Sequence, residues 1–320
     1  MIRYRPFLNC DPPGISEVWC AQPPQRGLMQ PMTPAVLDQI VLAKPYFDRD
    51  GLIVAEHDGK TIGFAHAGFK AGADGSGLNF EQGATCLVMV TPGEHQIGVG
   101  QELLAICEEY LVQRGAKTLF GGGIDSMAAF YFGLYGGCRV SGVLQADTMQ
   151  TSIFRQAGYL ERQRFRVLHR DLAGFRPVLN REIMQLRRQC HLQRAGDVLA
   201  TNWWEASSLG QIDQVRFELA ARHGDQRLGQ VGFWDIEPLA SSWGVHAMGM
   251  LQFEVSDNEQ RATLATFLLG EAIRELQSFG VTLVEVHADD EDEELVSVCT
   301  NLGFQQVDIG IQFERPKSGS

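Results

Sequence analysis

One turn of the sequence combines residue types that could bind a phosphate group. The apolar run ATCLVMV (84–90) is followed by TPGEHQIGVG (91–100), and apolar residues then recur at helical spacing over 101–115. The first N–H groups of a helix have no partner within it, and the helix dipole adds partial positive charge there. Gly98 and Gly100 would let the backbone approach a pyrophosphate without an intervening Cβ. A plain strand–turn–helix connection is the alternative, since the turn matches neither the full dinucleotide fingerprint nor a P-loop.

Apolar periodicity and turn residues predict the elements that must position this turn. In the first half, strands are expected at 2–6, on both sides of Asp58-Gly59, and at 84–90, 116–124 and 160–170, with helices at 34–44, 101–115 and after Asp147. In the second half, strands are expected within 217–236 (a hairpin) and at 247–255, 281–288 and 305–315, with helices at 266–280 and 289–304.

The second half therefore repeats the order of the first, and such internal repetition fixes the architecture. The two copies align at an offset of 165 residues, which falls to 145 near their ends, so the first copy holds about 20 extra residues. We expect one domain at 1–175 and a second at 176–320. The pairs that align at 165 are Val90 with Val255, Gly100 with Ala265 and Gly115 with Gly280, and Gly158 aligns with Gly303 at 145.

Composition excludes several classes of protein. The chain is 44% hydrophobic and 21% charged, as globular proteins are, and it contains no apolar run of 18 residues. We therefore expect no membrane partner and, without a secretory signal, a cytoplasmic location. The net charge is −12, of which −10 belongs to residues 173–320, so nucleic-acid binding through a basic face is disfavoured. The seven cysteines form no Cys-x-x-Cys pair and no His-Glu-x-x-His occurs, so no metal site is expected.

The order of elements, together with the turn, resembles the GNAT acetyltransferase superfamily, in a tandem arrangement. In that family a Val-x-Pro strand end is followed by Arg/Gln-x-x-Gly-x-Gly/Ala. Here Val90-Thr91-Pro92 precedes His95-Gln96-Ile97-Gly98-Val99-Gly100, with His95 where Arg or Gln is usual. The resemblance implies an α/β (α+β) fold of two GNAT-like domains. Each would have a mixed, mostly antiparallel twisted sheet flanked by helices.

The resemblance also implies a binding site for acetyl-CoA as co-substrate. The turn and helix start would bind the pyrophosphate, and the backbone of the preceding strand would pair with the pantetheine and the acetyl carbonyl. The residues implied are Val88, Met89, Val90, His95, Gln96, Ile97, Gly98, Val99, Gly100 and Gln101.

The family's usual acid is a tyrosine on the last helix of the domain, and that position holds Phe154 in the first copy and Cys299 in the second. Tyr131 and Tyr135 lie instead within the extra residues of the first copy. We predict that Tyr131 reaches the thioester sulfur, with Tyr135 next in line; the alternative is that both fill a lid or core. Cys299 is predicted to be an inert core thiol.

A base for the amine is not selected by any spacing, because Glu81, His66 and Asp125 all remain candidates, as does a water chain. Two other acidic features have plainer interpretations. Glu254 is expected at the edge of the second copy's strand. The acidic run at 289–294 is expected to open a helix as a solvated face.

The second copy departs further from the motif. Its turn reads Gln260-Arg261-Ala262-Thr263-Leu264-Ala265, so the β-branched Thr263 stands where the first copy has Gly98. We therefore expect a degenerate second domain. The sequence predicts an acetyl-CoA-dependent N-acetyltransferase acting on a small-molecule or peptide amine by direct attack in the N-terminal domain. Two alternatives remain: a non-catalytic acyl-CoA-binding or regulatory protein, and a transferase with a different acyl donor. The oligomeric state cannot be predicted.

Overall fold

The computed structural model describes residues 1–320 except 94, 197–199, 211, 225, 258–259 and 317–320. Its contacts divide the chain into two compact units. Unit 1 comprises residues 1–164, 200–210 and 309–320, and unit 2 comprises 165–199 and 211–308. Neither unit is a continuous stretch of sequence, and the linear boundary after residue 175 remains a prediction about the two sequence copies.

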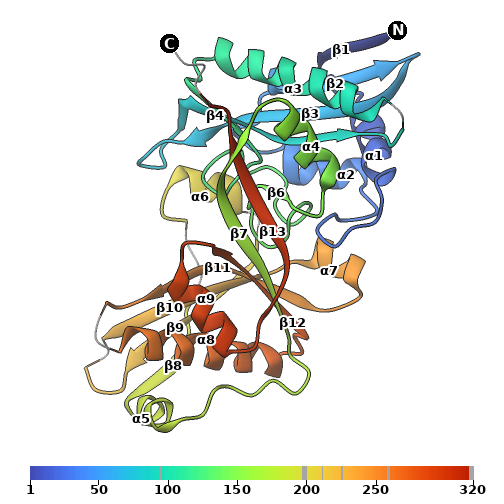
Figure 1. Cartoon of the computed structure of the whole chain (residues 1–320). Coiled ribbons are helices and arrows are strands. Elements are labelled where there is room, and N and C mark those ends of the chain that lie inside the picture. The colour runs from blue at the N-terminus through green and yellow to red at the C-terminus, as the bar shows by residue number, and fades with distance from the viewer. Residues whose placement is uncertain (94, 197–199, 211, 225, 258–259, 317–320) are drawn as a thin grey trace. The chain divides into compact units, whose positions relative to one another are not determined.

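Unit 1 is a mostly antiparallel sheet with helices on its faces (Figure 1). Among the described strands of this unit, the parallel pair is β4 with β5, as expected for strands joined by a helix. Its strands lie in the order β1 (Ile2–Pro6), β2 (Leu52–His57), β3 (Lys60–Ala71), β4 (Leu78–Val90), β5 (Thr118–Gly121) and β13 (Gln305–Glu314), and β6 (Val143–Leu144) pairs with β13. Its helices are α1 (Pro12–Cys20), α2 (Pro34–Leu37), α3 (Gln96–Gln113), α4 (Thr148–Gln156) and α6 (Trp203–Leu209).

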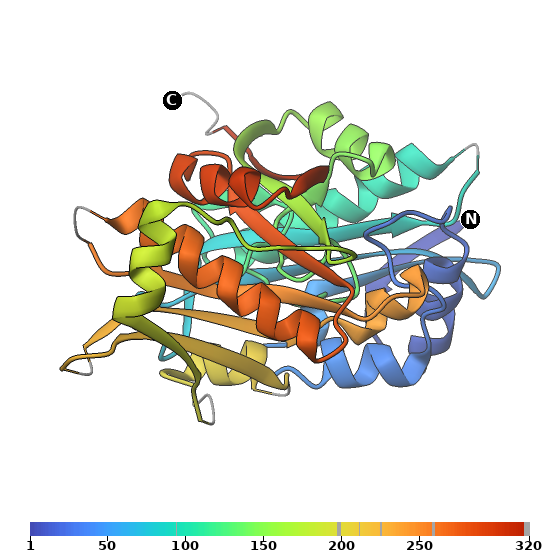
Figure 2. The same cartoon turned by 90° about the horizontal axis from the view of Figure 1, so that it is seen from below.

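Unit 2 repeats the plan, with α8 lying across one face of its sheet and α5 and α9 beside it (Figures 1 and 2). Its strands lie in the order β7 (Leu160–Asp171), β12 (Leu283–Asp289), β11 (Ala247–Val255), β10 (Arg227–Asp235), β9 (Gln214–Ala221) and β8 (Cys190–Arg194). Its helices are α5 (Arg181–Gln189), α7 (Glu237–Trp243), α8 (Arg261–Ser278) and α9 (Glu293–Asn301). The predicted fold class, two mixed and mostly antiparallel sheets flanked by helices, is confirmed.

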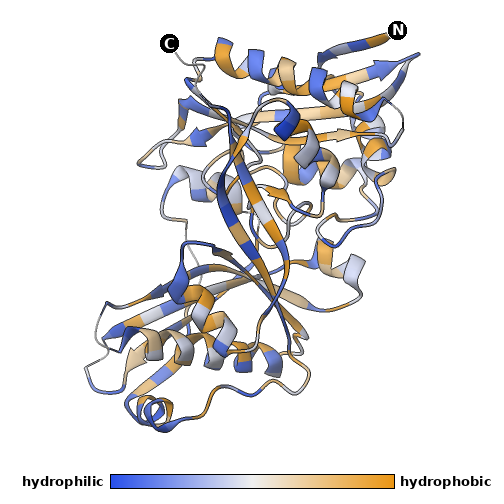
Figure 3. Ribbon diagram, in the orientation of Figure 1, coloured by the Kyte–Doolittle hydropathy of each residue, from blue (hydrophilic) through white to orange (hydrophobic). Residues whose placement is uncertain are grey.

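The closing strand of each sequence copy pairs with the sheet formed by the other copy. In unit 1, β13 pairs with β5 through Phe313 opposite Gly121. In unit 2, residues 165–171 of β7 pair with the whole of β12, from Phe165 opposite Asp289 to Asp171 opposite Leu283. The alternating apolar and polar residues of β13 are visible in Figure 3, and its Ile311 and Phe313 belong to the core of unit 1.

That core forms between the sheet and the inner faces of α3 and α4. Leu103, Cys107 and Leu111 of α3 lie one helical turn apart, which places them on one face of the helix. Phe154 of α4 stacks on Phe313 with ring centroids 5.7 Å apart. Phe154 is therefore a core residue.

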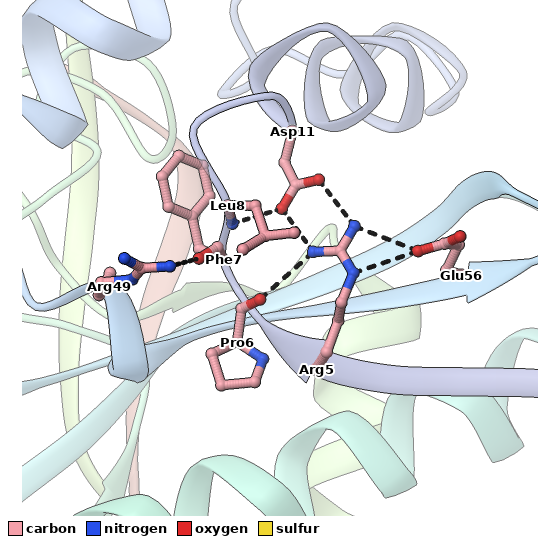
Figure 4. A network of polar contacts seen from close by, with 7 residues as sticks. All are labelled: Arg5, Pro6, Phe7, Leu8, Asp11, Arg49 and Glu56. Atoms are coloured by element: carbon pink, nitrogen blue, oxygen red, sulfur yellow. Dashed lines mark hydrogen bonds and ion pairs between the residues drawn. The ribbon is translucent and has the colours of Figure 1, made fainter.

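A partly buried ion-pair network joins β1 to the start of α1 and to β2 (Figure 4). The Arg5 guanidinium donates to both oxygens of Asp11, at 2.7 and 2.8 Å, and to Glu56 of β2 at 3.1 Å. Burial alone would raise the pKa of Asp11. Hydrogen bonds from Arg5 and from the Leu8 N–H, with the Arg5 charge, instead hold that pKa below its ordinary value.

The helix that follows the Gly-rich turn begins earlier in both copies than apolar periodicity predicts. α3 starts at Gln96 rather than at 101, and α8 starts at Arg261 rather than at 266. Gly98 and Gly100 therefore lie inside the first two turns of α3. The strand before the turn is also longer than predicted, because β4 begins at Leu78.

Four short elements of the second half were not predicted: α5, β8, α6 and α7. Within the described residues, no helix is both long enough and apolar enough to cross a membrane.

Candidate functional site

Strands β4 and β5 diverge toward the start of α3. They pair in parallel only from Gln82 opposite Thr118 to Thr85 opposite Gly121, whereas β4 continues to Val90. Val88, Met89 and Val90 are buried and pair with β3 on their other side. Beyond Thr85, the edge of β4 that faced β5 pairs with no strand among the described residues, and we call this edge, up to the turn before α3, the gap beside β4.

Backbone groups of Val88 and Val90 bond to glutamine side chains. The Val88 N–H donates to Gln150 Oε1 of α4 at 2.9 Å. The Val90 carbonyl accepts from Gln96 Nε2 at 3.1 Å and from Gln22 Nε2 at 3.0 Å. Gln96 thus ties the start of α3 to the end of β4.

The start of α3 is partly exposed and contains one glycine that the packing does not explain. His95 takes the N-cap position without a side-chain capping hydrogen bond among the described residues. A Cβ added at Gly98, which is exposed, would meet no atom within 4 Å. A Cβ at Gly100 would collide with the end of the Ile153 side chain of α4. Packing therefore explains Gly100 but not Gly98.

The remaining predicted residues of this helix start have different environments. Ile97 is partly buried and packs against the core of unit 1. Val99 is buried in that core. The Gln101 side chain donates to Gln156 Oε1 at 2.9 Å, which links α3 to α4.

Tyr131 lies in a buried aromatic cluster beside β3. Its hydroxyl is 3.1 Å from His66 Nδ1, and its ring lies 5.7 Å from that of Trp19 between centroids. Burial raises the pKa of Tyr131 well above its ordinary value and lowers that of His66 to about 3. The pair is therefore uncharged near neutral pH.

Tyr135 belongs to a different network, which reaches β4. Its hydroxyl donates to Asp147 Oδ2 at 3.0 Å and accepts from Gln150 Nε2 at 3.0 Å. It also accepts from the Leu144 N–H at 3.2 Å. Tyr135 is thus one side chain away from the Val88 N–H.

The three candidate bases differ in their ion pairs, hydrogen bonds and burial. Asp125 forms an ion pair with Arg139 and accepts from the Val140 N–H. Glu81 is exposed and paired with Lys117. His66 is fully buried, and its Nε2 has no hydrogen-bond partner among the described residues. None of the three lies free at the gap.

In unit 2, two carboxylates from other helices bond to residues at the corresponding helix start. Arg261 donates to both oxygens of Glu294, at 3.0 and 2.7 Å, and to the Val255 carbonyl at 2.9 Å. Thr263 donates to Glu182 Oε2 of α5 at 3.2 Å. A cavity of about 470 Å³ lies here between the starts of α5 and α8 and the helix α9. Glu294, which lines this cavity, and Glu182, which bonds to the lining residue Thr263, disfavour an anionic ligand there.

The other second-copy residues have structural surroundings. Cys299 is buried, and burial raises the pKa of its thiol to about 12, so it is not a reactive thiol. Glu254, which is exposed, accepts from Gln230 Nε2 at 2.7 Å. The acidic run opens α9, where the Asp292 side chain caps the helix by accepting from the Leu295 N–H.

A further cavity of unit 1, about 510 Å³ in volume, lies at the opposite end of α3. Phe47, Phe69, Tyr110 and Arg114 are among its lining residues. Since Tyr110 and Arg114 lie in and after the last turn of α3, this cavity is remote from the turn that precedes the helix.

The contact between Gln150 and Asp147 at this site was not predicted from the sequence. Asp147 was predicted only as a helix cap, which it is, since it accepts from the Gln150 N–H at 3.1 Å. The spacing Asp-x-x-Gln is close to that of a capping box and could have drawn attention to Gln150. Nothing local in the sequence indicates that Gln150 bonds to Val88, 62 residues away.

Comparisons with known proteins agree with this geometry. Residues 17–131 match the model of the acetyltransferase (GNAT) family. No curated protein sequence matches the chain significantly.

Three solved structures are similar over nearly the whole chain. A tandem GNAT protein from the clavulanic acid biosynthesis pathway has a TM-score of 0.64 at 14% identity, with 100% of both chains covered. A GCN5-related N-acetyltransferase from Sphaerobacter thermophilus has a TM-score of 0.63 at 15% identity, covering 98% of this chain and 96% of that one. A glucosamine N-acetyltransferase region of a fungal multi-domain β-N-acetylglucosaminidase has a TM-score of 0.71 at 14% identity, covering 98% of this chain and 38% of that one.

The resemblance predicted from the sequence is therefore confirmed: residues 17–131 match the acetyltransferase (GNAT) family, and the chain has the fold of the tandem GNAT protein.

Proposed function

We propose that unit 1 is an N-acetyltransferase that binds acetyl-CoA at the start of α3. The acetyl group would pass to a primary amine of a small molecule or peptide. The GNAT fold supports acyltransferase activity in general, and the choice of unit 1 is carried by Gly98. Glycine inside a helix costs about 1 kcal/mol relative to alanine, and open space surrounds this one. A ligand that must approach the backbone closely gives a reason for this glycine that folding does not.

The residues around Gly98 fit a pyrophosphate. Backbone N–H groups at a helix start and the helix dipole both favour an anion. His95 and Gln96 flank the site and can donate hydrogen bonds, and no carboxylate of the described residues is paired to this turn as Glu182 and Glu294 are in unit 2. Acetyl-CoA, when bound, would supply the thioester whose acetyl group is transferred.

The chemistry requires positioning, a donor for the carbonyl oxygen and a proton acceptor. The amine nitrogen bonds to the carbonyl carbon as the C–S bond breaks, the amine loses a proton and the thiolate gains one. The gap beside β4 would hold the reacting groups, with a backbone N–H at Val88 to Val90 as donor to the carbonyl oxygen. Tyr131 remains the proposed acid and Tyr135 the second candidate.

Calorimetric titration of the full chain with acetyl-CoA tests this proposal. We expect binding to the wild type and none detectable to Gly98→Val, whose branched side chain fills the approach to the backbone. Thr263→Val, the matched change in the second copy, should bind normally. Absence of binding to the wild type, or loss of binding only in Thr263→Val, would contradict the proposal.

A non-catalytic acyl-CoA-binding protein is the second candidate, and one observation favours it. The hydroxyl of Tyr131 is engaged by His66 and buried, so the structure holds no exposed acid at the gap among the described tyrosines 131 and 135. Release of CoA thiol across a panel of amines separates the two candidates. Binding without thiol release, unchanged in Tyr131→Phe and Tyr135→Phe, would favour the non-catalytic protein. Parallel titrations with longer acyl-CoAs test for a different donor.

A further inference from the structure

The edge of β4 that faces the gap carries one N–H whose partner is a side chain rather than a strand. Pairing with β5 ends at Thr85, and the Val88 N–H bonds to the Gln150 amide oxygen at 2.9 Å. An unpaired strand edge is a template for an extended ligand with amide or carbonyl groups, because such a ligand completes the missing hydrogen bonds. Gln150 supplies a carbonyl oxygen at the place where a ligand would supply one.

The orientation of the Gln150 amide is fixed by its neighbours. Its Nε2 donates to Asp147 Oδ2 at 2.6 Å and to the Tyr135 hydroxyl at 3.0 Å. A carboxylate only accepts, so the NH₂ group must face Asp147 and the oxygen must face Val88. Gln150 has no exposed surface, and all of its amide hydrogen-bonding groups are engaged. Such a network is specific because each buried polar group in it depends on the others.

The position of Val88 relates this contact to the acyl end of a donor. A donor whose phosphates lie at the start of α3 would enter the gap beside Val90 and extend toward the point where β4 and β5 meet. Val88 lies deeper in the gap than Val90, on the side of the closed end at Thr85. The Val88 N–H is therefore placed for the acyl carbonyl rather than for the phosphate end.

The second sequence copy shows the same backbone without the amide. β11 and β12 pair from Ala247 to Gly249 and then diverge, as β4 and β5 do. At the offset of 145 residues, Asp292 corresponds to Asp147 and Leu295 to Gln150. Asp292 accepts from the Leu295 N–H at 3.0 Å, so the helix cap is kept. Leucine has no acceptor, so only the first copy places a carbonyl oxygen into its gap from this position.

We propose that Gln150 is a positioning residue of the acyl site: its amide oxygen holds the Val88 N–H in place of the acyl carbonyl and yields that N–H when the acyl donor binds. This inference rests on the proposed binding of acetyl-CoA by unit 1. It follows that CoA, which lacks the acyl carbonyl, leaves the Gln150 contact intact, whereas acetyl-CoA must replace it.

The affinities of acetyl-CoA and CoA for Gln150→Leu, which copies the residue of the second copy, test the inference. Without Gln150, the Val88 N–H is buried and unpartnered until an acyl carbonyl restores its hydrogen bond. The ratio of the CoA dissociation constant to that of acetyl-CoA should therefore rise about tenfold over the wild type. Ser152→Ala, at a partly exposed position of the same helix, should leave the ratio unchanged, since the bond that its hydroxyl makes within the described residues is to the Thr148 carbonyl.

A second measurement uses the wild-type protein and does not depend on how the variant folds. The amide resonance of Val88 should shift clearly more on addition of acetyl-CoA than on addition of CoA, because only acetyl-CoA replaces its hydrogen bond to Gln150. An unchanged affinity ratio in Gln150→Leu, or a Val88 resonance that responds equally to both ligands, would overturn the inference.

The two proposals fail in different ways. If the wild type binds neither ligand, or binds them independently of Gly98, the proposed function fails and this inference fails with it. If binding depends on Gly98 while the ratio and the Val88 resonance do not respond as stated, only the role of Gln150 is wrong.

Discussion

The two sequence copies use the same strand–turn–helix backbone and surround it with opposite chemistry. In both, the side chain of the first helix residue donates a hydrogen bond to the carbonyl of the last strand residue. Gln96 donates to Val90, and Arg261 donates to Val255. Two residues later the copies differ. Gly98 is exposed and open, whereas Thr263 is bonded to a carboxylate of α5.

This difference separates a contact that folding requires in both copies from a glycine that only the first copy has. The glutamine or arginine contact that joins helix to strand is kept in both copies, so we assign it to folding. The glycine is kept in only one, although it destabilises a helix. Unit 2 also adds α5 and its Glu182 over the start of α8, which neutral or cationic ligands would tolerate better than phosphates. The comparison therefore separates a scaffold from a candidate site.

The largest expected effect comes from exchanging the two residues. Gly98→Thr should weaken acetyl-CoA binding by about a hundredfold or more, because the branched side chain blocks the helix start. Thr263→Gly should create no binding site, because Glu182 and Glu294 remain beside that turn. Calorimetry on each single variant and on the double variant measures both effects. Binding that moves with the glycine into the second copy would show that the acids there are irrelevant.

The second largest effect is expected on stability, when the N-cap aspartates of α4 and α9 are replaced. Asp147→Ala should destabilise unit 1 by about 3 kcal/mol or more, because it removes the cap and leaves the buried Gln150 and Tyr135 groups without their acceptor. Asp292→Ala should cost about 1 kcal/mol, the ordinary value of a cap. Denaturant unfolding followed by hydrogen exchange of each unit checks this. Equal losses would mean that the Asp147 network adds nothing beyond capping.

A pH effect tests whether residues 200–210 belong with unit 1. Lys44 donates to the Ser208 carbonyl at the end of α6 at 2.7 Å, and burial lowers its pKa from 10.5 to about 8. Between pH 8 and 10.5 the unfolded chain binds more protons than the folded one, so stability should rise with pH, by at most about 3 kcal/mol.

Lys44→Met should abolish this rise and stabilise the protein at pH 7. Unfolding at a series of pH values, followed by tryptophan fluorescence, measures it; Trp203 and Trp204 lie on α6, the helix that Lys44 contacts. A stability that is flat between pH 8 and 10.5 in the wild type would argue against a buried, charged Lys44.

The smallest effect concerns the two glycines of α3. Gly98→Ala should stabilise the free protein by about 1 kcal/mol, because the Cβ enters open space in a helix. Gly100→Ala should destabilise it, because the Cβ meets Ile153. Thermal unfolding without ligand compares the two. A loss of stability in Gly98→Ala would indicate a folding role for Gly98 and remove the argument for a ligand.

Sequence reasoning predicted the strands well, because their apolar runs and the Asp58-Gly59 turn are local signals. It placed the starts of α3 and α8 too late, since the first helical turn carries no apolar pattern. It missed α5 and α6, which are short; α5 is also largely hydrophilic, as Figure 3 shows. Asn180 and Asn202 cap these two helices and were the available signals.

The site was predictable only where it is local. The turn at 91–100 could be found because its residues are adjacent. The contact between Gln150 and Val88, the burial of Tyr131 against His66 and the pairing of β13 with β5 join residues that are 62 to more than 190 positions apart. No periodicity in one stretch of chain encodes such contacts. Glu182, the carboxylate that accepts from Thr263, lies on α5, a helix that was not predicted.

The pairing of β13 with β5 has a consequence for synthesis of the chain. β5 is synthesised long before residues 309–314. The edge of β5 that pairs with β13 therefore stays unpaired until synthesis has passed residue 314. Ile311 and Phe313 also complete its core. A fragment that stops near residue 175 would keep that edge open and tend to aggregate. The candidate cofactor site is thus translated well before the strand that completes its scaffold.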